Sequence, residues 1–597
     1  MKHLKSLNRF FVRYAWHLLG GTLFVAISNY FRILQPQMLR NALDLVVDNI
    51  GMYQLTQGFE NQSKLYDILS KSVFLFGIVV LIAAILMGVF MYLMRQTIIV
   101  MSRLIEYDMR KEIYDQYQKL SLAFYRRNTT GDMMSRVTED VNKVRMYLGP
   151  AILYGINLVT LFVLVIYSMM IVSPILTFYS LSLLPFLVIA IYLVSHQINV
   201  RSGLIQKQLA ELTGAAQETF SGIRVVKSYV QEGSMLENFT IQSENYKQQA
   251  LGRAKIDNAF FPIMLLMIGA STIVTVYVGG LQVVEGNITA GNIAEFVIYV
   301  GMLTWPVTSI GWIASLAQQA DASQKRINDF LDLKPEIENQ AIEKNTSKRL
   351  EGSIQFKNVS FTYPDTGMNA LKNLDFELKQ GQKMAIIGKT GSGKTTIADL
   401  LVRMYDCTTG SIEIGGVDIR ERDLEHLRRR IGYVPQDIFL FSDTIASNIA
   451  FGRNDIVPQT EIETYARYAA VYDDIMNLPK GFETAVGERG VTLSGGQKQR
   501  VSIARAFIKH PDIVILDDCL SAVDTHTEQT ILGYLQNTLA DKTAIIITHR
   551  IYGLLNFDKI IVLEDGKMAE MGTHESLLQN KGYYYDLFEN QRQQETV

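Results

Sequence analysis

Long apolar runs dominate the first half of the chain. Six of them occur between residues 14 and 316, and each is close to or longer than the roughly 20 residues that a helix needs to cross a ~30 Å hydrocarbon layer. They cover residues 16–34, 72–94, 146–172, 175–194, 259–284 and 293–316. Because buried helices of water-soluble domains are seldom this long and this numerous, the pattern predicts an α-helical domain that spans a membrane six times.

The basic residues between these runs predict the orientation of the membrane domain. The N-terminal segment and the long segments 95–145 and 201–255 are rich in Lys and Arg, whereas 173–174 and 285–292 contain neither. Since basic loops stay on the cytoplasmic side, both ends of the chain are expected in the cytoplasm. This distribution predicts a multi-pass protein of the cytoplasmic membrane, embedded in the lipid bilayer.

The two long basic segments are expected to form helices that continue beyond the membrane. Their turning points lie near Phe124 and Tyr125, with Gly131 close by, and near Gly222. We expect these turning points to contact a domain on the cytoplasmic side.

The pattern changes after residue 316. Residues 321–348 are polar and charged and include a proline, which is typical of a linker. From residue 352 onward short β-rich runs alternate with amphipathic helical patterns, and the buried-strand candidates are 384–387, 513–516, 544–548 and 560–563. This alternation predicts a mainly parallel α/β sheet. The expected organisation is a membrane domain at 1–320, a linker at 321–350 and an α/β domain at 351–597.

Composition excludes several classes of function. The 597 residues carry a net charge of −2, and 19% of them are charged. An almost neutral chain lacks the positive charge that binds phosphate backbones, so no nucleic-acid partner is expected. The two cysteines, Cys407 and Cys519, are too few for a disulfide framework or a Cys-based zinc site.

A glycine-rich loop follows the first of these buried strands. Gly388 to Thr395 matches the pattern G-x-x-x-x-G-K-[ST], with a strand before it and a helix after it. The glycines let backbone N–H groups surround phosphates, Lys394 can reach the β- and γ-phosphates, and Thr395 can offer its hydroxyl to Mg²⁺. The predicted ATP-binding residues are Gly388, Lys389, Thr390, Gly391, Ser392, Gly393, Lys394, Thr395 and Thr396.

Two carboxylates end the next buried strand. Residues 513–516 run directly into Asp517 and Asp518. A carboxylate at the C-terminal end of a parallel strand beside the glycine-rich loop can hold Mg²⁺, so Asp517 is the predicted metal ligand beside Thr395. Asp518 is the candidate for acting on the water that attacks the γ-phosphate. ATP and Mg²⁺ are therefore the expected cofactors.

With these motifs together, the second half of the chain resembles the ABC ATPases. The segment that is similar to the signature motif of that family consists of Leu493, Ser494, Gly495, Gly496 and Gln497. By its position in the family pattern, Tyr363 matches the residue that stacks on adenine, and Gln436 matches the glutamine that links the nucleotide and its Mg²⁺ to the membrane domain. The resemblance likewise implies that Asp524 belongs to the D-loop and that His549 contacts the γ-phosphate.

Six spans followed by one ATPase domain resemble a half-size ABC exporter of the multidrug type. In that family the signature motif completes the nucleotide site of the opposite subunit, so the resemblance implies that the chain is one half of a dimer. ATP-driven closure is then expected to turn a membrane cavity from inward- to outward-facing, and hydrolysis to reset it. The implied activity is export of a small hydrophobic or amphiphilic substrate, either drug-like or lipidic.

One position departs from the family pattern. Members that hydrolyse ATP efficiently carry Glu directly after the Walker B aspartate, and here that residue is Asp518. Losing one methylene withdraws the carboxylate by about 1.5 Å, and a base misplaced by that much can slow a reaction on the order of a hundredfold. The chain thus resembles the degenerate-site chain of heterodimeric bacterial ABC exporters. A homodimer with a working Asp518 and an ATP-gated channel or regulator that does not pump are the alternatives.

The sequence does not identify the transported substrate. Arg32 lies inside the first apolar run, with Asn29 one turn away. An arginine within a membrane span marks a functional site by default, which makes Asn29 and Arg32 candidate substrate residues. An arginine that extends its side chain to the outer interface is the other interpretation.

Overall fold

Two units of different architecture make up the chain. A computed structural model describes residues 2–55, 58, 61–339, 349–487, 490–519, 527, 530–531, 533, 542–549 and 557–595. Unit 1 consists of Met1–Gln118 and Gly131–Leu333, and unit 2 consists of Lys119–Thr130 and Lys334–Val597. By its contacts, part of the first long basic segment therefore belongs to unit 2.

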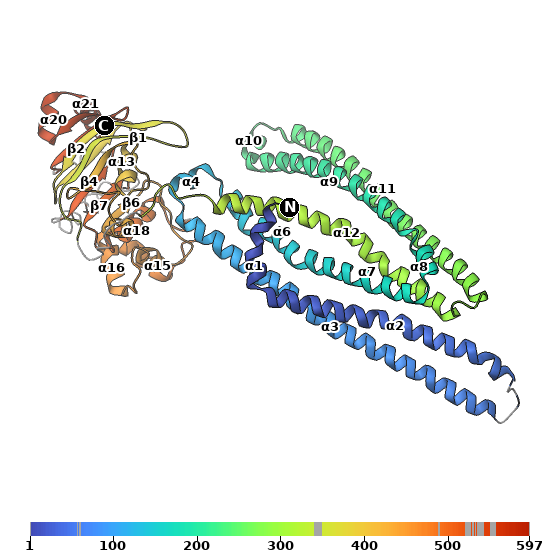
Figure 1. Ribbon diagram of the computed structural model, residues 1–597. Helices are drawn as coiled ribbons and strands as arrows, with labels where there is room; N and C mark the ends of the chain where they lie inside the picture. Colours follow the sequence, from blue (N-terminus) through green and yellow to red (C-terminus); the bar gives the residue numbers. More distant parts are fainter. Residues whose placement is uncertain are drawn as a thin grey trace. The chain divides into compact units, whose positions relative to one another are not determined.

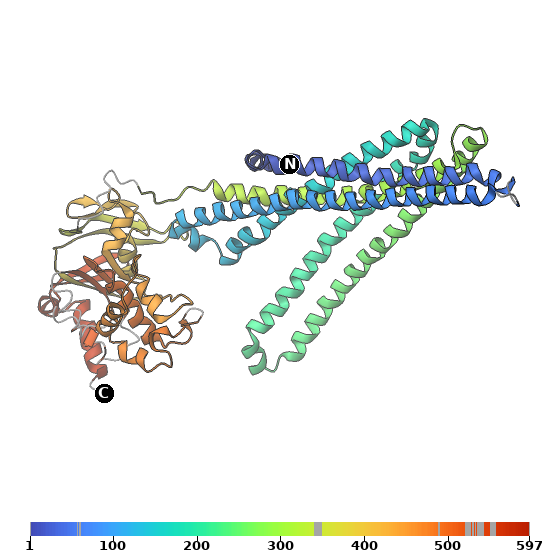
Figure 2. The same ribbon diagram turned by 90° about the horizontal axis from the view of Figure 1, so that it is seen from below.

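Unit 1 is built from helices (Figure 1). In chain order they are η1 (His3–Leu7), α1 (Asn8–Arg13), α2 (Ala15–Leu55), α3 (Asn61–Lys119), α5 (Thr130–Ser135), the π-helical turn η2 (Arg136–Asp140), α6 (Val141–Met146), the π-helical turn η3 (Tyr147–Ala151), α7 (Ile152–Val172), α8 (Pro174–Leu181), α9 (Leu184–Ser221), α10 (Ile223–Ser228), α11 (Glu232–Val284) and α12 (Ala290–Leu331). Helices α9 and α11 run side by side and are joined at one end by α10 (Figure 2). The helical character predicted for the two basic segments is thus confirmed.

Five helical stretches of the described residues are long and apolar enough to cross a membrane. They are Gln62–Lys119, Thr130–Val172, Pro174–Ile191, Glu232–Val284 and Ala290–Leu331. A sixth is reached when His3–Arg13 and Ala15–Leu55, which meet at a bend of 88°, are taken together as one span. The helical membrane domain is therefore present, with five to six candidate spans where the sequence predicts six.

Polar side chains join α2 to the beginning of α12. Nη1 of Arg40 lies 3.1 Å from Oε2 of Glu295, whose side chain is fully buried. The hydroxyl of Tyr299 donates a hydrogen bond to the other oxygen of Glu295 at 2.8 Å. Nearby, the backbone N–H of Gly291 donates to Oδ1 of Asp44, also at 2.8 Å. These contacts satisfy the buried carboxylate and hold two helices together that are far apart in the sequence.

The described residues of unit 2 form two sheets and the helices that cover them. The six-stranded sheet has the order β10-β9-β3-β8-β7-β6 and is parallel except for β10. The four-stranded sheet is antiparallel, with the order β2-β1-β4-β5. The strands are β1 (Ile354–Thr362), β2 (Asn369–Leu378), β3 (Lys383–Gly388), β4 (Thr409–Ile414), β5 (Val417–Asp418), β6 (Ile431–Val434), β7 (Ile513–Asp517), β8 (Thr543–Ile547), β9 (Lys559–Glu564) and β10 (Lys567–Gly572). The predicted parallel sheet is confirmed, and its four predicted strands are β3, β7, β8 and β9.

The helices of unit 2 include one that comes from the membrane half of the sequence. They are α4 (Leu122–Arg127), α13 (Lys394–Leu401), α14 (Leu424–Arg430), α15 (Ile445–Ala450), α16 (Gln459–Tyr468), α17 (Tyr472–Met476), η4 (Gly481–Glu483), α18 (Gly495–Phe507), α20 (His574–Asn580) and α21 (Tyr583–Glu595). Ala123 of α4 is buried in the same apolar cluster as the two sheets. Helix α4 is therefore an integral part of this unit.

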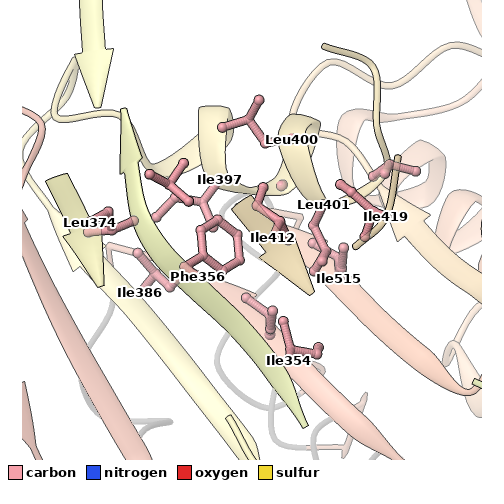
Figure 3. Packing of buried hydrophobic residues seen from close by; sticks show 14 of the residues in the cluster. Ile354, Phe356, Leu374, Ile386, Ile397, Leu400, Leu401, Ile412, Ile419 and Ile515 are labelled. Atoms are coloured by element: carbon pink, nitrogen blue, oxygen red, sulfur yellow. The ribbon is translucent and has the colours of Figure 1, made fainter. Parts of the chain in front are cut away.

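The apolar cluster between the sheets holds α13 in place (Figure 3). Ile397, Leu400 and Leu401 of α13 are buried together with Phe356 of β1 and Ile386 of β3. The three side chains of α13 follow the helical spacing of i, i+3 and i+4, which puts them on one face of the helix. Because both ends of the glycine-rich loop are anchored in this core, the loop itself is held at the carboxyl edge of the parallel sheet.

Candidate nucleotide-binding site

The loop between β3 and α13 takes backbone conformations that favour glycine. Gly391 and Gly393 have φ angles of 83° and 100°. A Cβ added to Gly393 would lie 2.5 Å from the carbonyl oxygen of Ala370, so a side chain cannot fit there. Gly393 is the N-cap of α13, whose first N–H groups face the loop. The loop thus presents backbone donors and the positive end of a helix dipole to an anion.

Lys394 lies within the glycine-rich loop that it follows in sequence. Its Nζ donates hydrogen bonds to the carbonyl oxygens of Gly388 at 2.8 Å and of Lys389 at 2.9 Å. Burial lowers the pKa of Lys394, and the negative charge of Asp517 opposes that shift. The ammonium group is therefore held inside the loop by carbonyl oxygens, at a place where it can pair with phosphate oxygens.

Residues at or just after the ends of β1, β6, β7 and β8 lie around the same space as the loop. A cavity of about 230 Å³ is lined by Tyr363, Met368, Ala370, Thr390, Gly391, Gly393, Lys394, Thr395, Thr396, Gln436, Asp517, Asp518, Ile547 and His549. Six residues of the predicted loop thus share one space with Tyr363, Gln436, Asp517, Asp518 and His549, whereas Gly388, Lys389 and Ser392 are not among its described lining residues.

Asp517 has the properties of a metal ligand. Its Oδ2 is buried and has no hydrogen-bond partner among the described residues, and the same is true of Oγ of Ser392. Burial raises the pKa of Asp517, while a hydrogen bond from Thr395 acts in the opposite direction. A buried carboxylate oxygen without a donor beside a threonine hydroxyl fits Mg²⁺, which prefers oxygen ligands.

The described residues by themselves do not supply a complete set of metal ligands. The described residues contain no group of three or more His, Cys, Asp or Glu side chains that could hold a metal ion. Mg²⁺ bound at Thr395 and Asp517 would therefore need oxygens from phosphates and water to complete its six-fold coordination. This requirement suits a nucleotide site, in which metal and phosphates bind together.

The residue after Asp517 adopts a left-handed backbone conformation. Asp518 has a φ angle of 46°, and its N–H donates a hydrogen bond to the carbonyl oxygen of Ile547 at 2.9 Å. Asp and Asn tolerate this conformation better than most residues, because their short polar side chains can hydrogen-bond locally. The backbone bond ties Asp518 to the end of β8, so its carboxylate projects from a fixed point of the cavity wall.

His549 follows β8, the strand whose last residue, Ile547, accepts the backbone hydrogen bond from Asp518. Burial, together with the positive charge of Lys394, lowers the pKa of His549 below its usual value. The imidazole is therefore neutral at physiological pH, and one ring nitrogen can donate a hydrogen bond while the other accepts one. An N–H donor at this place can contact a phosphate oxygen.

Tyr363 is fixed by several neighbours. Its hydroxyl is 2.9 Å from Oγ1 of Thr396, and its ring packs almost perpendicular to those of Phe361 and Tyr405. The guanidinium carbon of Arg126, on α4, lies 4.7 Å from the centre of the Tyr363 ring. Sequence reasoning missed Arg126, although it follows Phe124 and Tyr125 at one of the predicted contact points.

The signature segment lies outside this cavity. Ser494 is the N-cap of α18, and its side chain and that of Gln497 form a reciprocal capping box. Ser494 and Gly495 are exposed, and none of the residues from Leu493 to Gln497 is among the described residues that line the cavity. The exposed N-terminus of α18 nevertheless directs backbone N–H groups outward, as an anion-binding helix end does. Asp524, predicted to belong to the D-loop, lies outside the described residues.

The two candidate substrate residues differ in their surroundings. Asn29 is 2% exposed, and its Nδ2 donates hydrogen bonds to Oδ1 of Asn157 at 3.1 Å and to Oγ1 of Thr160 at 2.7 Å. This amide joins α2 to α7, as polar side chains between membrane helices often do. Arg32 is half-buried. A role in substrate binding stays a prediction for both residues.

A P-loop nucleotide site on the same chain as a helical membrane domain defines a membrane-bound P-loop ATPase. Residues 18–307 match the family described as the ABC transporter transmembrane region, and residues 371–521 match the ABC transporter family. The chain therefore belongs to the ABC transporter family, with the layout of a half-size exporter. Its ATPase is of the kind that is coupled to transport.

Individual relatives agree with this assignment. The chain is 35% identical over 99% of its length to the probable multidrug resistance ABC transporter ATP-binding/permease protein YheI of Bacillus subtilis, of which 97% is covered. It is 33% identical over 99% of its length to the multidrug resistance-like ATP-binding protein MdlA of Escherichia coli, of which 97% is covered. A lipid A-core flippase of Syntrophus aciditrophicus is 34% identical over 82% of this chain and 81% of its own length.

A solved structure also matches nearly the whole chain. It is the structure of a bacterial Atm1-family ABC exporter with ATP bound, and it superimposes with a TM-score of 0.77 at 25% sequence identity. The match covers 96% of this chain and 99% of the other. The fold is therefore that of an ABC exporter over both units.

Proposed function

We propose that this protein is one half of an ATP-driven exporter in the cytoplasmic membrane, with its termini and ATPase unit in the cytoplasm. The observation that carries the proposal is that the signature segment and the nucleotide cavity of one chain are separate. Its cavity contains Lys394, Asp517 and His549, whereas the exposed signature segment at the N-terminus of α18 lies outside it. In a dimer the signature segment of each chain would cover the cavity of the other chain. Two nucleotides would then be bound, each of them from both sides.

The residues of the cavity have distinct roles in this proposal. The loop from Gly388 to Thr396 and Lys394 bind the phosphates, Tyr363 stacks on the adenine, and Thr395, Gln436 and Asp517 hold Mg²⁺. When bound, Mg²⁺ neutralises charge that develops on the phosphate oxygens. Asp518 orients the attacking water and accepts its proton, and His549 donates a hydrogen bond to the γ-phosphate. Ser494 and Gly496 of the partner would contact the same phosphate through a hydroxyl and a backbone N–H.

Exposed apolar groups support a dimer as well. The end of the α9–α11 pair carries exposed side chains on and around α10, namely Phe220, Ile223, Val225, Tyr229 and Val230. Unit 2 has an exposed aromatic cluster of Phe439, Phe441 and Phe451. An apolar surface of this kind on a water-exposed helical turn indicates a protein contact. We assign α10 of one chain to the aromatic cluster of the other.

We further propose that the partner is a second, different half-transporter. The carboxylate of Asp518 is one methylene shorter than that of a glutamate, so it is retracted from the attacking water by about 1.5 Å. This chain's own Walker site would then bind ATP and hydrolyse it slowly, while its intact signature segment completes a fast site on the partner. A homodimer in which Asp518 works through a shifted water is the competing arrangement.

The relatives suggest the class of substrate. Two are described by their names as multidrug resistance or multidrug resistance-like proteins and one as a lipid A-core flippase. Drug-like and lipidic molecules share an apolar body that partitions into a bilayer. We therefore propose a small hydrophobic or amphiphilic substrate, moved from the inner side of the membrane to the outer side.

The pairing is tested by disabling each half-site in the complex reconstituted with its partner. In a heterodimer Ser494→Arg should abolish ATP turnover, because it blocks the fast site, whereas Lys394→Ala should leave most of the turnover intact. In a homodimer both substitutions would abolish it. The chain alone should turn over ATP slowly, and Asp518→Glu should accelerate it on the order of ten- to a hundredfold. Brisk turnover by the chain alone that Asp518→Ala abolishes would contradict the weak site.

Transport itself is tested in vesicles that contain the complex and a fluorescent amphiphile. ATP-dependent accumulation against a gradient is the expected result. Passive flux that responds to ATP binding and needs no hydrolysis would instead show an ATP-gated channel.

A further inference from the structure

Helix α4 contacts Tyr363, the ring assigned to adenine, through the side chain of Arg126. Arg126 is the last residue but one of α4 (Leu122–Arg127). This helix lies on the segment 119–130, which belongs to unit 2. The guanidinium carbon of Arg126 lies 4.7 Å from the centre of the Tyr363 ring. A cation at this distance over a ring face is attracted by the ring quadrupole.

Two further contacts fix the direction of the Arg126 side chain. Its Nη1 donates a hydrogen bond to the hydroxyl of Tyr405 at 3.4 Å, and its Nε lies 3.4 Å from Oδ2 of Asp365. Tyr405 is buried and also packs against Tyr363, and Asp365 is two residues further along the same loop. The guanidinium is therefore held over the ring from more than one side, which distinguishes it from a mobile surface arginine.

The ring is shared between Arg126 and the cavity. Tyr363 lines the nucleotide cavity with Met368 and Ala370, whereas Arg126, Asp365 and Tyr405 are not among its described lining residues. The hydroxyl of Tyr363 is held by Thr396 on α13, so the ring cannot turn freely. A purine that enters the cavity would then meet the side of the ring that Arg126 does not cover.

We infer that Arg126 is a positioning residue for the adenine base, a role that rests on the proposed ATP-binding function of the site. The guanidinium, the Tyr363 ring and the purine form one stack, in which Arg126 holds the ring at the orientation that the base needs. Because Arg126 belongs to α4, which continues from the long helix α3, occupancy of the base site and docking of α4 stabilise one another. Such coupling is reciprocal, so whatever loosens α4 also weakens base binding.

The test compares a ligand that has the base with one that lacks it. Binding of Mg-ATP and of Mg-tripolyphosphate to the full-length chain is measured by calorimetry in detergent or nanodiscs. Arg126→Ala should weaken ATP binding about three- to fivefold, in line with an exposed cation–π contact, and leave tripolyphosphate binding unchanged. Arg126→Lys keeps the charge without the planar guanidinium, so its affinity for ATP should lie between those of the wild type and of Arg126→Ala.

Arg127→Ala is the matched control. Arg127 is the next residue of the same helix, but its Nη1 pairs with Glu336 at 3.2 Å. This variant should bind both ligands as the wild type does. Equal losses in Arg126→Ala and Arg127→Ala would show that α4 merely docks, and equal losses of ATP and tripolyphosphate would show a general effect of charge; either result overturns the inference.

Hydrogen exchange provides a second readout that does not depend on the affinity. ATP should slow amide exchange in residues 119–130 of the wild type, and tripolyphosphate or the Arg126→Ala variant should show no such protection. The same protection by both ligands would contradict a signal from the base. A wild-type chain that binds neither ligand would refute the proposed function itself, whereas normal ATP binding that is insensitive to Arg126 would refute only this inference.

Discussion

The guanidinium of Arg40 on α2 and the carboxylate of Glu295 on α12 lie 3.1 Å apart, with the Glu295 side chain fully buried. Tyr299 donates a hydrogen bond to the second carboxylate oxygen. The carboxylate therefore has one partner on α2 and one on its own helix, α12. Removal of one partner from a buried pair leaves an uncompensated charge, which costs more than the net value of the pair. This pair should therefore be a main tie between the first and last long helices of unit 1.

A double-mutant cycle measures that tie. Arg40→Ala should lower the thermal midpoint of the purified protein clearly, and the Arg40→Ala/Glu295→Ala double variant should be less destabilised than the sum of the two single variants. The coupling energy is expected at about 1 to 3 kcal/mol. Lys71 and Asp67 form an exposed pair at 2.6 Å and serve as the control, since Lys71→Ala should cost less than about 0.5 kcal/mol. Equal effects of Arg40→Ala and Lys71→Ala would contradict the expectation.

The close approach of α2 and α12 depends on Gly291. A Cβ at this position would lie 2.7 Å from the carbonyl oxygen of Arg40 and also collide with the carboxylate of Asp44. Gly291→Ala should therefore lower the stability by about 1 to 3 kcal/mol, measured as a lower thermal midpoint. Gly301, on the same helix, has nothing within 4 Å of an added Cβ. Gly301→Ala should be neutral or slightly stabilising because alanine favours helix, and a loss equal to that of Gly291→Ala would count against the steric argument.

Two lysines of the glycine-rich loop should differ in their importance. Lys394 points its Nζ into the loop, so Lys394→Ala removes a charged donor from the phosphate site and should weaken ATP binding about ten- to a hundredfold. The ammonium of Lys389 instead lies 3.6 Å from Glu564 and 5.4 Å from the centre of the Tyr583 ring. Calorimetry should show less than about a twofold change for Lys389→Ala. Comparable losses in the two variants would mean that the nucleotide does not bind as proposed.

Asp399 on α13 should make the stability of unit 2 depend on pH. Burial raises the pKa of this carboxyl from 3.8 to about 6, and the hydroxyl of Tyr433 donates a hydrogen bond to its Oδ1 at 3.3 Å. Since the folded protein holds the proton more tightly than the unfolded chain, the contribution is fully present below pH 3.8 and is lost as the pH rises through about 6.

Asp399→Asn removes this dependence while its amide oxygen still accepts from Tyr433. Without nucleotide, the variant should be more stable than the wild type at pH 7.5 by about 2 to 3 kcal/mol, and the difference should vanish near pH 4. Chemical unfolding at a series of pH values checks both points. An advantage that stays constant from pH 4 to 7.5 would show that the carboxyl does not titrate in this range.

Most of the fold and much of the site could be predicted from local patterns. The four buried-strand candidates appear as β3, β7, β8 and β9, because a short apolar run bounded by turn residues is typical of a strand buried on both faces. The residues from Gly388 to Thr396 could be assigned since their chemistry depends on neighbours in the sequence. The number of spans follows less directly from the sequence: six are predicted, and the described residues give five, or six when the two helices that meet at a bend of 88° are counted as one span.

The sequence by itself determined the class of protein: apolar runs long enough for a bilayer, a phosphate-binding loop and a signature segment are properties of contiguous residues. Only the tertiary structure decided which distant groups meet. It joined Asn29 to Asn157, paired Arg40 with Glu295, left Ser494 outside the cavity and laid Arg126 against Tyr363. The physical reason is that a side chain's partner across hundreds of residues is set by how helices and sheets pack, and the choice of partner, unlike the buried face of a helix, leaves no periodic pattern in the sequence.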